Sequence, residues 1–284
     1  MSDHSTLHNS LSGHPWTDNN VWPSGKWLGG YMAIGLVAGI ASAMLGIGSG
    51  VLIVPLLSGW FHVPIKRAVG ISIVSVFGVV LVGVIAEAIT TDNIHWFLAI
   101  MLAVGAQSGV RLGGWLSTRI SNNVLRWSFI VMLIFTALKL AGLIPGDTAV
   151  GLFDRTEICS AWILTVLALG GLAGTLSVML GIGGGIVAVP GLLFLVNEMS
   201  FQAARATSLA MIVPTSLAGT FTHASHKNVL WRSVIAIVVP GCVGAITGVI
   251  LANIIPGAVL RGYVFPIFLG IMVIRLVFAK SEKE

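Results

Sequence analysis

The sequence predicts an all-α, polytopic helical membrane protein made of two inverted repeats, and three observations predict it. Of the 284 residues, 56% are hydrophobic and 9% are charged, whereas soluble domains carry about a quarter charged residues. Apolar stretches of about 20 residues, the length of a membrane span, recur along nearly the whole chain. The phrase MLGIGSGVLIVP at Met44–Pro55 also returns as MLGIGGGIVAVP at Met179–Pro190.

A single offset of 135 residues aligns more than these two phrases. It also pairs Trp96 with Trp231 and several glycines with glycines, among them Gly35 with Gly170, Gly39 with Gly174 and Gly109 with Gly244. We therefore expect a first transmembrane repeat at 28–143, a polar linker at 144–159 and a second transmembrane repeat at 160–279. Residues 1–27 and 280–284 are predicted to be polar cytoplasmic tails, the first of them disordered.

The remaining composition excludes several classes. The net charge of +5 comes from single basic residues between apolar segments, which is typical of topology signals and not of nucleic-acid binding. Cys159 and Cys242 lie in or beside apolar segments without metal-ligand spacing and are predicted to be packing thiols. His4, His8 and His14 would suit a metal, but a disordered tail explains them better. No cofactor or metal is predicted.

Each repeat contains four apolar blocks, and the first block is too long for one span. The blocks are 28–61, 65–88, 96–117 and 124–143, then 160–197, 202–223, 232–253 and 258–279. A helix over 28–61 would run about 51 Å at about 1.5 Å per residue, against a hydrocarbon core of about 30 Å. We expect each first block to fold back at its glycine phrase, because glycine adopts the backbone angles of a sharp turn.

The distribution of charge supports these re-entrant hairpins. If each first block returns to its own side, one side receives most of the basic residues: Lys26, Lys66, Arg67, Arg119, Arg126, Lys227, Arg232, Lys280 and Lys283. The other side keeps Arg155, Arg205 and Arg261 with the acidic residues Asp92, Asp147, Asp154, Glu157 and Glu198. The positive-inside rule then predicts cytoplasmic termini in the bacterial plasma membrane. Each repeat makes three crossings plus a hairpin, so the second repeat is inverted, as in many secondary transporters.

The two glycine phrases are candidates for an anion site. A short helix is expected to begin near Val51 and near Ile186, with unpaired N–H groups at the positive end of the helix dipole. Small anions bind such ends. The candidate binding residues are Gly46, Gly48, Ser49, Gly50, Gly181, Gly183, Gly184 and Gly185. The alternative is that these glycines, like Gly35 and Gly39, only allow close helix packing.

Polar residues within the spans have two interpretations each. Ser72, Thr207 and Ser208 either line the anion site or bond to their own helix backbone. Arg111, with Gln107 one turn deeper, either binds the anion or extends to the cytoplasmic surface, which is the favoured interpretation.

Glu87 and His223 end the second and sixth blocks. Either side chain is a candidate for carrying a proton that couples to transport, since histidine titrates near neutrality. The favoured alternative places both at the membrane surface, where such residues have no transport role.

The chain resembles the sulfite exporter TauE/SafE family of membrane permeases. The resemblance rests on both glycine phrases followed by Val-Pro, and on Ala204-Arg205-Ala206-Thr207-Ser208 through His223 to Asn228-Val229 and Trp231. It covers nearly all of 30–279. Ile71 stands where that family suggests a threonine, and Glu87 lies near the position matching His223. The resemblance implies transport of sulfite, sulfonates or thiosulfate without a cofactor.

The predicted function is therefore secondary transport of a small anion by alternating access around the glycine turns. The favoured substrate is a sulfur oxyanion or sulfonate. The partners are that anion and membrane lipid, with no nucleic acid. The alternatives are an anion channel or a transporter of another small carboxylate or oxyanion. An enzyme is not predicted, because the sequence offers no metal-ligand cluster and no nucleophile with its base. A purely structural subunit remains a further alternative.

Overall fold

A computed structural model of the chain describes residues 25–61, 63–116, 130–131, 134, 137–138, 160–180, 183–196, 199–225 and 230–278. The predicted tails and linker, His4, His8, His14, Cys159 and most of block 124–143 lie outside these residues.

The described residues fold into helices joined by short connections, as the composition predicts. The first repeat contributes α2 (Lys26–Leu45), α3 (Gly50–Gly59), α4 (Ile65–Thr90) and α5 (Trp96–Leu116). The second contributes α7 (Ser160–Leu180), α8 (Gly185–Leu195), α9 (Phe201–Ser225), α10 (Trp231–Ile254), α11 (Gly257–Val259), the π-helical η1 (Leu260–Val264) and α12 (Phe265–Phe278). Among described residues, α2, α4 and α10 are long and apolar enough to cross a membrane.

Each predicted first block is broken into two helices that fold back. The ring of Phe61, just after α3, stacks on Tyr31 near the start of α2, with ring centroids 5.2 Å apart. The chain therefore leaves at the end where it entered. In the second repeat, Trp162 at the start of α7 and Val196 after α8 line one cavity, so this hairpin closes in the same way. Both predicted hairpins are confirmed.

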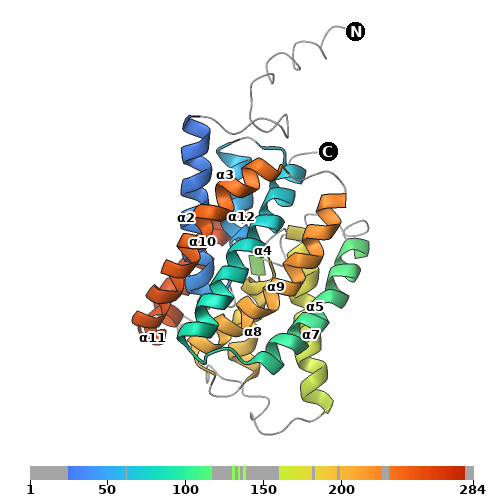
Figure 1. The fold of residues 1–284 in the computed structure, drawn as a ribbon. Coiled ribbons are helices and arrows are strands. Elements are labelled where there is room, and N and C mark those ends of the chain that lie inside the picture. Colours follow the sequence, from blue (N-terminus) through green and yellow to red (C-terminus); the bar gives the residue numbers. More distant parts are fainter. Residues whose placement is uncertain are drawn as a thin grey trace.

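The long helix of each hairpin packs against a helix of the other repeat. Figure 1 shows α2 beside α10 on one side of the molecule and α5 beside α7 on the other, with α4 and α9 between them. A methyl group on Gly35 would clash with the carbonyl oxygen of Ile237 in α10, and one on Gly170 with that of Leu102 in α5. Glycine at these positions brings backbones together. The packing role expected for Gly35 is confirmed.

These two contacts are related by the repeat. Helix α2 corresponds to α7 and α10 to α5, so α2·α10 and α7·α5 are the same contact made twice. Both pairs run parallel: Gly35 meets Ile237 and Gly39 meets Gly241 further along. The hairpin of each repeat therefore packs against the other repeat, and we call these exchanged hairpins. This arrangement places both glycine turns at the centre of the protein.

Candidate functional site

The first turn, between α2 and α3, depends on glycine. Gly46 ends α2 with φ of 73°, and its N–H donates to the carbonyl oxygen of Ser42 at 2.8 Å. Gly48 has φ of 82°. A side chain in this left-handed region costs about 1–2 kcal/mol, so the chain can reverse here cheaply only with glycine. Gly50 then begins α3, as the sequence predicts.

The second turn also uses glycines with positive φ, at Gly183, the equivalent of Gly48, and at Gly184, the equivalent of Ser49. Gly183 and Gly184 have φ of 86° and 77°, and Gly185 begins α8. A methyl group on Gly184 would lie 2.8 Å from the carbonyl oxygen of Ala173 in α7. Gly181 lies outside the described residues.

The two turns meet. A methyl group on Gly183 would lie 3.8 Å from Cα of Gly48, 3.6 Å from the side chain of Val76 and 3.5 Å from that of Ile212. Gly48 corresponds to Gly183 and Val76 to Ile212 between the repeats. The pseudo-twofold axis of the inverted repeats therefore passes between the turns.

Two helix N-termini converge on this meeting point. The first bonds of α3 run from the N–H groups of Leu52 and Ile53 to the carbonyl oxygen of Ser49, and those of α8 run to Gly184. The amides at Gly50 and Gly185 precede these bonds and have no partner within their helices. Each terminus carries the positive end of a helix dipole. The centre of the protein thus offers backbone donors from both repeats.

Three buried serine hydroxyls lack partners among the described residues: Ser42, which the sequence did not single out, and the predicted candidates Ser49 and Ser72. The side chains of Ser49, in the first turn, and Ser72, in α4, are 1% and 0% exposed. Neither hydroxyl has a hydrogen-bond partner among the described residues. An unsatisfied buried polar group costs about 1–3 kcal/mol, so both hydroxyls are suited to a polar ligand.

The other predicted serine and threonine already have partners. The hydroxyl of Ser208 donates to the carbonyl oxygen of Gly46 at 2.8 Å, which ties α9 to the first turn. The Thr207 hydroxyl accepts from the N–H of His95 at 3.1 Å, just before α5. Ser208 thus contacts the first glycine turn, whereas Thr207 contacts the residue that precedes α5.

The remaining candidates are spread more widely. Arg111 is exposed on α5. The Gln107 side chain donates to the carbonyl oxygen of Pro214 at 3.0 Å, which joins α5 to α9. His223 lies in α9, and its side chain is outside the described part of the chain.

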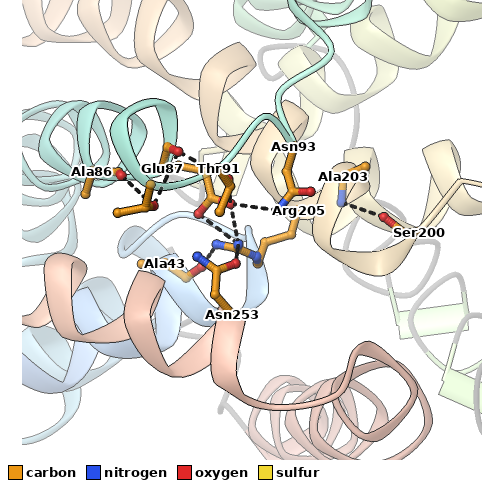
Figure 2. Close-up of polar contacts among 10 residues, drawn as sticks. Ala43, Ala86, Glu87, Thr91, Asn93, Ser200, Ala203, Arg205 and Asn253 are labelled. Atoms are coloured by element: carbon orange, nitrogen blue, oxygen red, sulfur yellow. Dashed lines mark hydrogen bonds and ion pairs between the residues drawn. The ribbon is translucent and has the colours of Figure 1, made fainter.

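Glu87 forms a buried ion pair with Arg205 and has no surface exposure. Nη2 of Arg205 donates to Oε1 and Oε2 of Glu87 at 2.7 and 2.8 Å, and both side chains are 0% exposed. Figure 2 shows the guanidinium between Glu87 and two other helices: Nη1 donates to the carbonyl oxygen of Ala43 at 2.8 Å, and Nη2 reaches Oδ1 of Asn253 at 3.3 Å. The side chains of Thr91 and Asn93 donate to Oε1 of Glu87 at 2.9 and 3.3 Å.

Glu87 is therefore held inside the protein by a cation from the other repeat. Its expected depth near the membrane surface stays a prediction. The importance of Arg205 was missed. The signal was available: an arginine between alanines inside an apolar block needs a counter-charge. With two hairpins, Glu87 and Arg205 fall on the same side of the membrane, whereas unbroken first blocks would separate them. The ion pair thus supports the hairpin topology independently.

Comparison with known proteins indicates the family of the chain. The family model of the sulfite exporter TauE/SafE matches residues 8–140 and 166–284. "Probable membrane transporter protein MJ0441" of Methanocaldococcus jannaschii is 29% identical over 67% of this chain and 70% of its own. "Probable membrane transporter protein YdhB" of Bacillus subtilis is 24% identical over 83% of this chain and 96% of its own.

A "probable membrane transporter protein" of Xylella fastidiosa is 28% identical over 77% of this chain and 82% of its own. No solved structure matches the chain. The family match spans both repeats, and the relatives are named as transporters and not as enzymes. The chain is an integral membrane transporter that belongs to the sulfite exporter TauE/SafE family.

Proposed function

We propose that this transporter carries a small anion, sulfite or another sulfur-containing oxyanion or sulfonate, by alternating access around the two glycine turns. It acts in the bacterial plasma membrane with both termini in the cytoplasm, which follows from the positive-inside distribution of its charges. Its partners are the anion and membrane lipid.

The observation that carries the proposal is the convergence of donors at the pseudo-twofold axis. The turns that precede α3 and α8 meet there, and the buried hydroxyls of Ser49 and Ser72 have no partner among the described residues. All of these groups can donate hydrogen bonds. Donors gathered in a water-poor interior favour an anion with several acceptor oxygens.

These donors also suit an anion that has to be released after transport. Backbone amides and hydroxyls bind an oxyanion without the large desolvation cost of a buried lysine or arginine. The family assignment points to sulfur oxyanions among the small anions that fit. The alternatives, a channel or a carrier of another carboxylate or oxyanion, remain outcomes of the test.

The exchanged hairpins suggest which parts move together. The glycine contacts hold α2 to α10 and α7 to α5 across the repeats. We therefore expect these two cross-repeat pairs to act as rigid bodies, with the turns and the helices α4 and α9 between them. Rocking of one pair against the other would open the centre alternately to each side.

Counterflow in proteoliposomes tests the proposal. Vesicles preloaded with unlabelled anion are diluted into radiolabelled sulfite, thiosulfate, taurine as a zwitterionic sulfonate, sulfate or acetate. We expect saturable accumulation of at least one sulfur anion, which a channel does not produce. If none of the sulfur anions accumulates above protein-free vesicles, the substrate assignment is wrong. Accumulation of acetate alone would favour the carboxylate alternative.

A further inference from the structure

The ion pair of Arg205 and Glu87 lies beside the first glycine turn and is absent from the equivalent place at the other end. The backbone of Arg205 packs against this turn: a methyl group on Gly46 would lie 2.8 Å from its Cα and 2.8 Å from its carbonyl oxygen. The guanidinium also binds the carbonyl oxygen of Ala43 in the last turn of α2. A movement of Arg205 therefore has to displace the end of α2 and the turn that follows.

Four elements meet at this guanidinium. Glu87 lies in the last turn of α4, Arg205 in the second turn of α9, Asn253 in the last turn of α10 and Ala43 in the last turn of α2. Helices α2 and α4 belong to the first repeat, and α9 and α10 belong to the second. The side chain therefore joins both repeats at the end of the molecule that the charge distribution places outside the cell.

The inverted repeat allows a direct comparison with the opposite end. In this part of the chain an offset of 136 residues relates Val76 to Ile212 and Ser72 to Ser208. The same offset relates Arg205 to Val69 and Glu87 to His223. Valine carries no charge, so the equivalent ion pair cannot form at the cytoplasmic end. The two ends therefore differ in this contact.

We infer that the Arg205–Glu87 ion pair positions the first glycine turn and closes the outer end of the transporter, which makes the outward-open state the less populated one. This inference rests on the proposed alternating access. A buried, multiply hydrogen-bonded ion pair suits such a contact, because separating it leaves an uncompensated charge. A weaker pair, or a neutral one, would let the outer end open more often.

Thiol accessibility at the first turn measures this closure without any substrate. Ser49→Cys is introduced after Cys159 and Cys242 are replaced by alanine. Ser49 is a suitable reporter because it is buried and its hydroxyl has no partner among described residues to lose. A membrane-impermeant maleimide is added to right-side-out vesicles and, separately, to inside-out vesicles.

Glu87→Gln keeps the shape of the side chain and removes its charge. We expect it to raise the labelling rate from outside by about tenfold or more. A minor outward-open state is populated at roughly 0.1–10%, so its population can increase by that factor. Thr90→Val is the matched control at the same end of α4. Among the described residues its hydroxyl bonds within its own helix, to the carbonyl oxygens of Ala86 and Glu87, and the labelling rate should stay at that of the parent.

Arg205→Lys provides a second variant should Glu87→Gln fail to enter the membrane. It keeps the charge, loses the second guanidinium nitrogen that donates to the carbonyl oxygen of Ala43, and should raise labelling from outside in the same direction. Outside rates in a folded Glu87→Gln or Arg205→Lys protein that equal those of the Thr90→Val control would overturn the inference. Because labelling needs no anion, failure of the counterflow assay would reject the substrate and leave this result standing.

Discussion

The two glycine turns have almost the same sequence, and the structure anchors them differently. The first turn contains Ser49 where the second contains Gly184, and it is held by the Ser208 hydroxyl and the backbone of Arg205. The second turn packs closely on the backbone of Ala173 in its own hairpin. Both repeats have thus kept the glycine turn, while the residues that support each turn have diverged. Such divergence lets an inverted repeat favour one of its two states.

The largest effect is expected where the turns touch each other. Gly185→Ala would place a methyl group against the carbonyl oxygen of Gly46, a backbone atom that cannot move aside. We predict loss of folded protein or of all transport, measured by detergent-solubilised yield and counterflow. Gly183→Ala is the matched comparison: its methyl meets nothing closer than 3.5 Å, so it should show only the strain of a positive φ, about 1–2 kcal/mol. Equal behaviour of the two variants would contradict the close approach of the turns.

The ion pair should produce the next largest effect. Glu87→Leu leaves the Arg205 guanidinium buried without its counter-charge, which typically costs about 3–5 kcal/mol. Adding Arg205→Met should recover most of that stability while transport remains impaired. Thermal unfolding in detergent across the two single variants and the double variant gives the coupling between them. Additive losses would mean that the two side chains act independently.

Much of this architecture could be predicted from the sequence, because length and repetition constrain a membrane chain strongly. The excess length of 28–61 requires a break, and glycine marks its position. The exchange of hairpins could not be predicted. Gly35 and Gly109 indicate that two helices pack closely, but the sequence does not indicate which helix is the partner. The Arg205–Glu87 pair required the topology first, because its members lie 118 residues apart in sequence.

The equivalent serines Ser72 and Ser208 sharpen the comparison further. Ser208→Ala removes the hydrogen bond to Gly46 and should cost about 1 kcal/mol of stability. Ser72→Ala removes a hydroxyl without a partner among described residues and should leave stability unchanged or slightly raised. Thermal unfolding without anion checks both. A larger loss for Ser72→Ala would contradict the assignment of its hydroxyl as unpaired.

The smallest effect is expected in α12, away from both turns. A methyl group on Gly270 would meet nothing within 4 Å, so Gly270→Ala should stabilise the helix by about 0.5–1 kcal/mol. Gly244→Ala, in contrast, would clash with the carbonyl oxygen of Leu36 in α2 and should destabilise the α2·α10 pair. If Gly270→Ala and Gly244→Ala changed the unfolding temperature in the same direction, the close α2·α10 contact would not depend on glycine at position 244.

The central claim is that the two turns, together with the unpaired hydroxyls of Ser49 and Ser72, bind the transported anion. The most direct test is the apparent affinity for the best sulfur anion in counterflow, compared among wild type, Ser49→Ala, Ser72→Ala and Gly270→Ala. A hydrogen bond to a charged group contributes about 1.5–3 kcal/mol, and about 1.4 kcal/mol is a factor of ten. We predict that each serine variant weakens binding by about tenfold or more while Gly270→Ala binds as wild type. Unchanged affinity in both serine variants would contradict the claim.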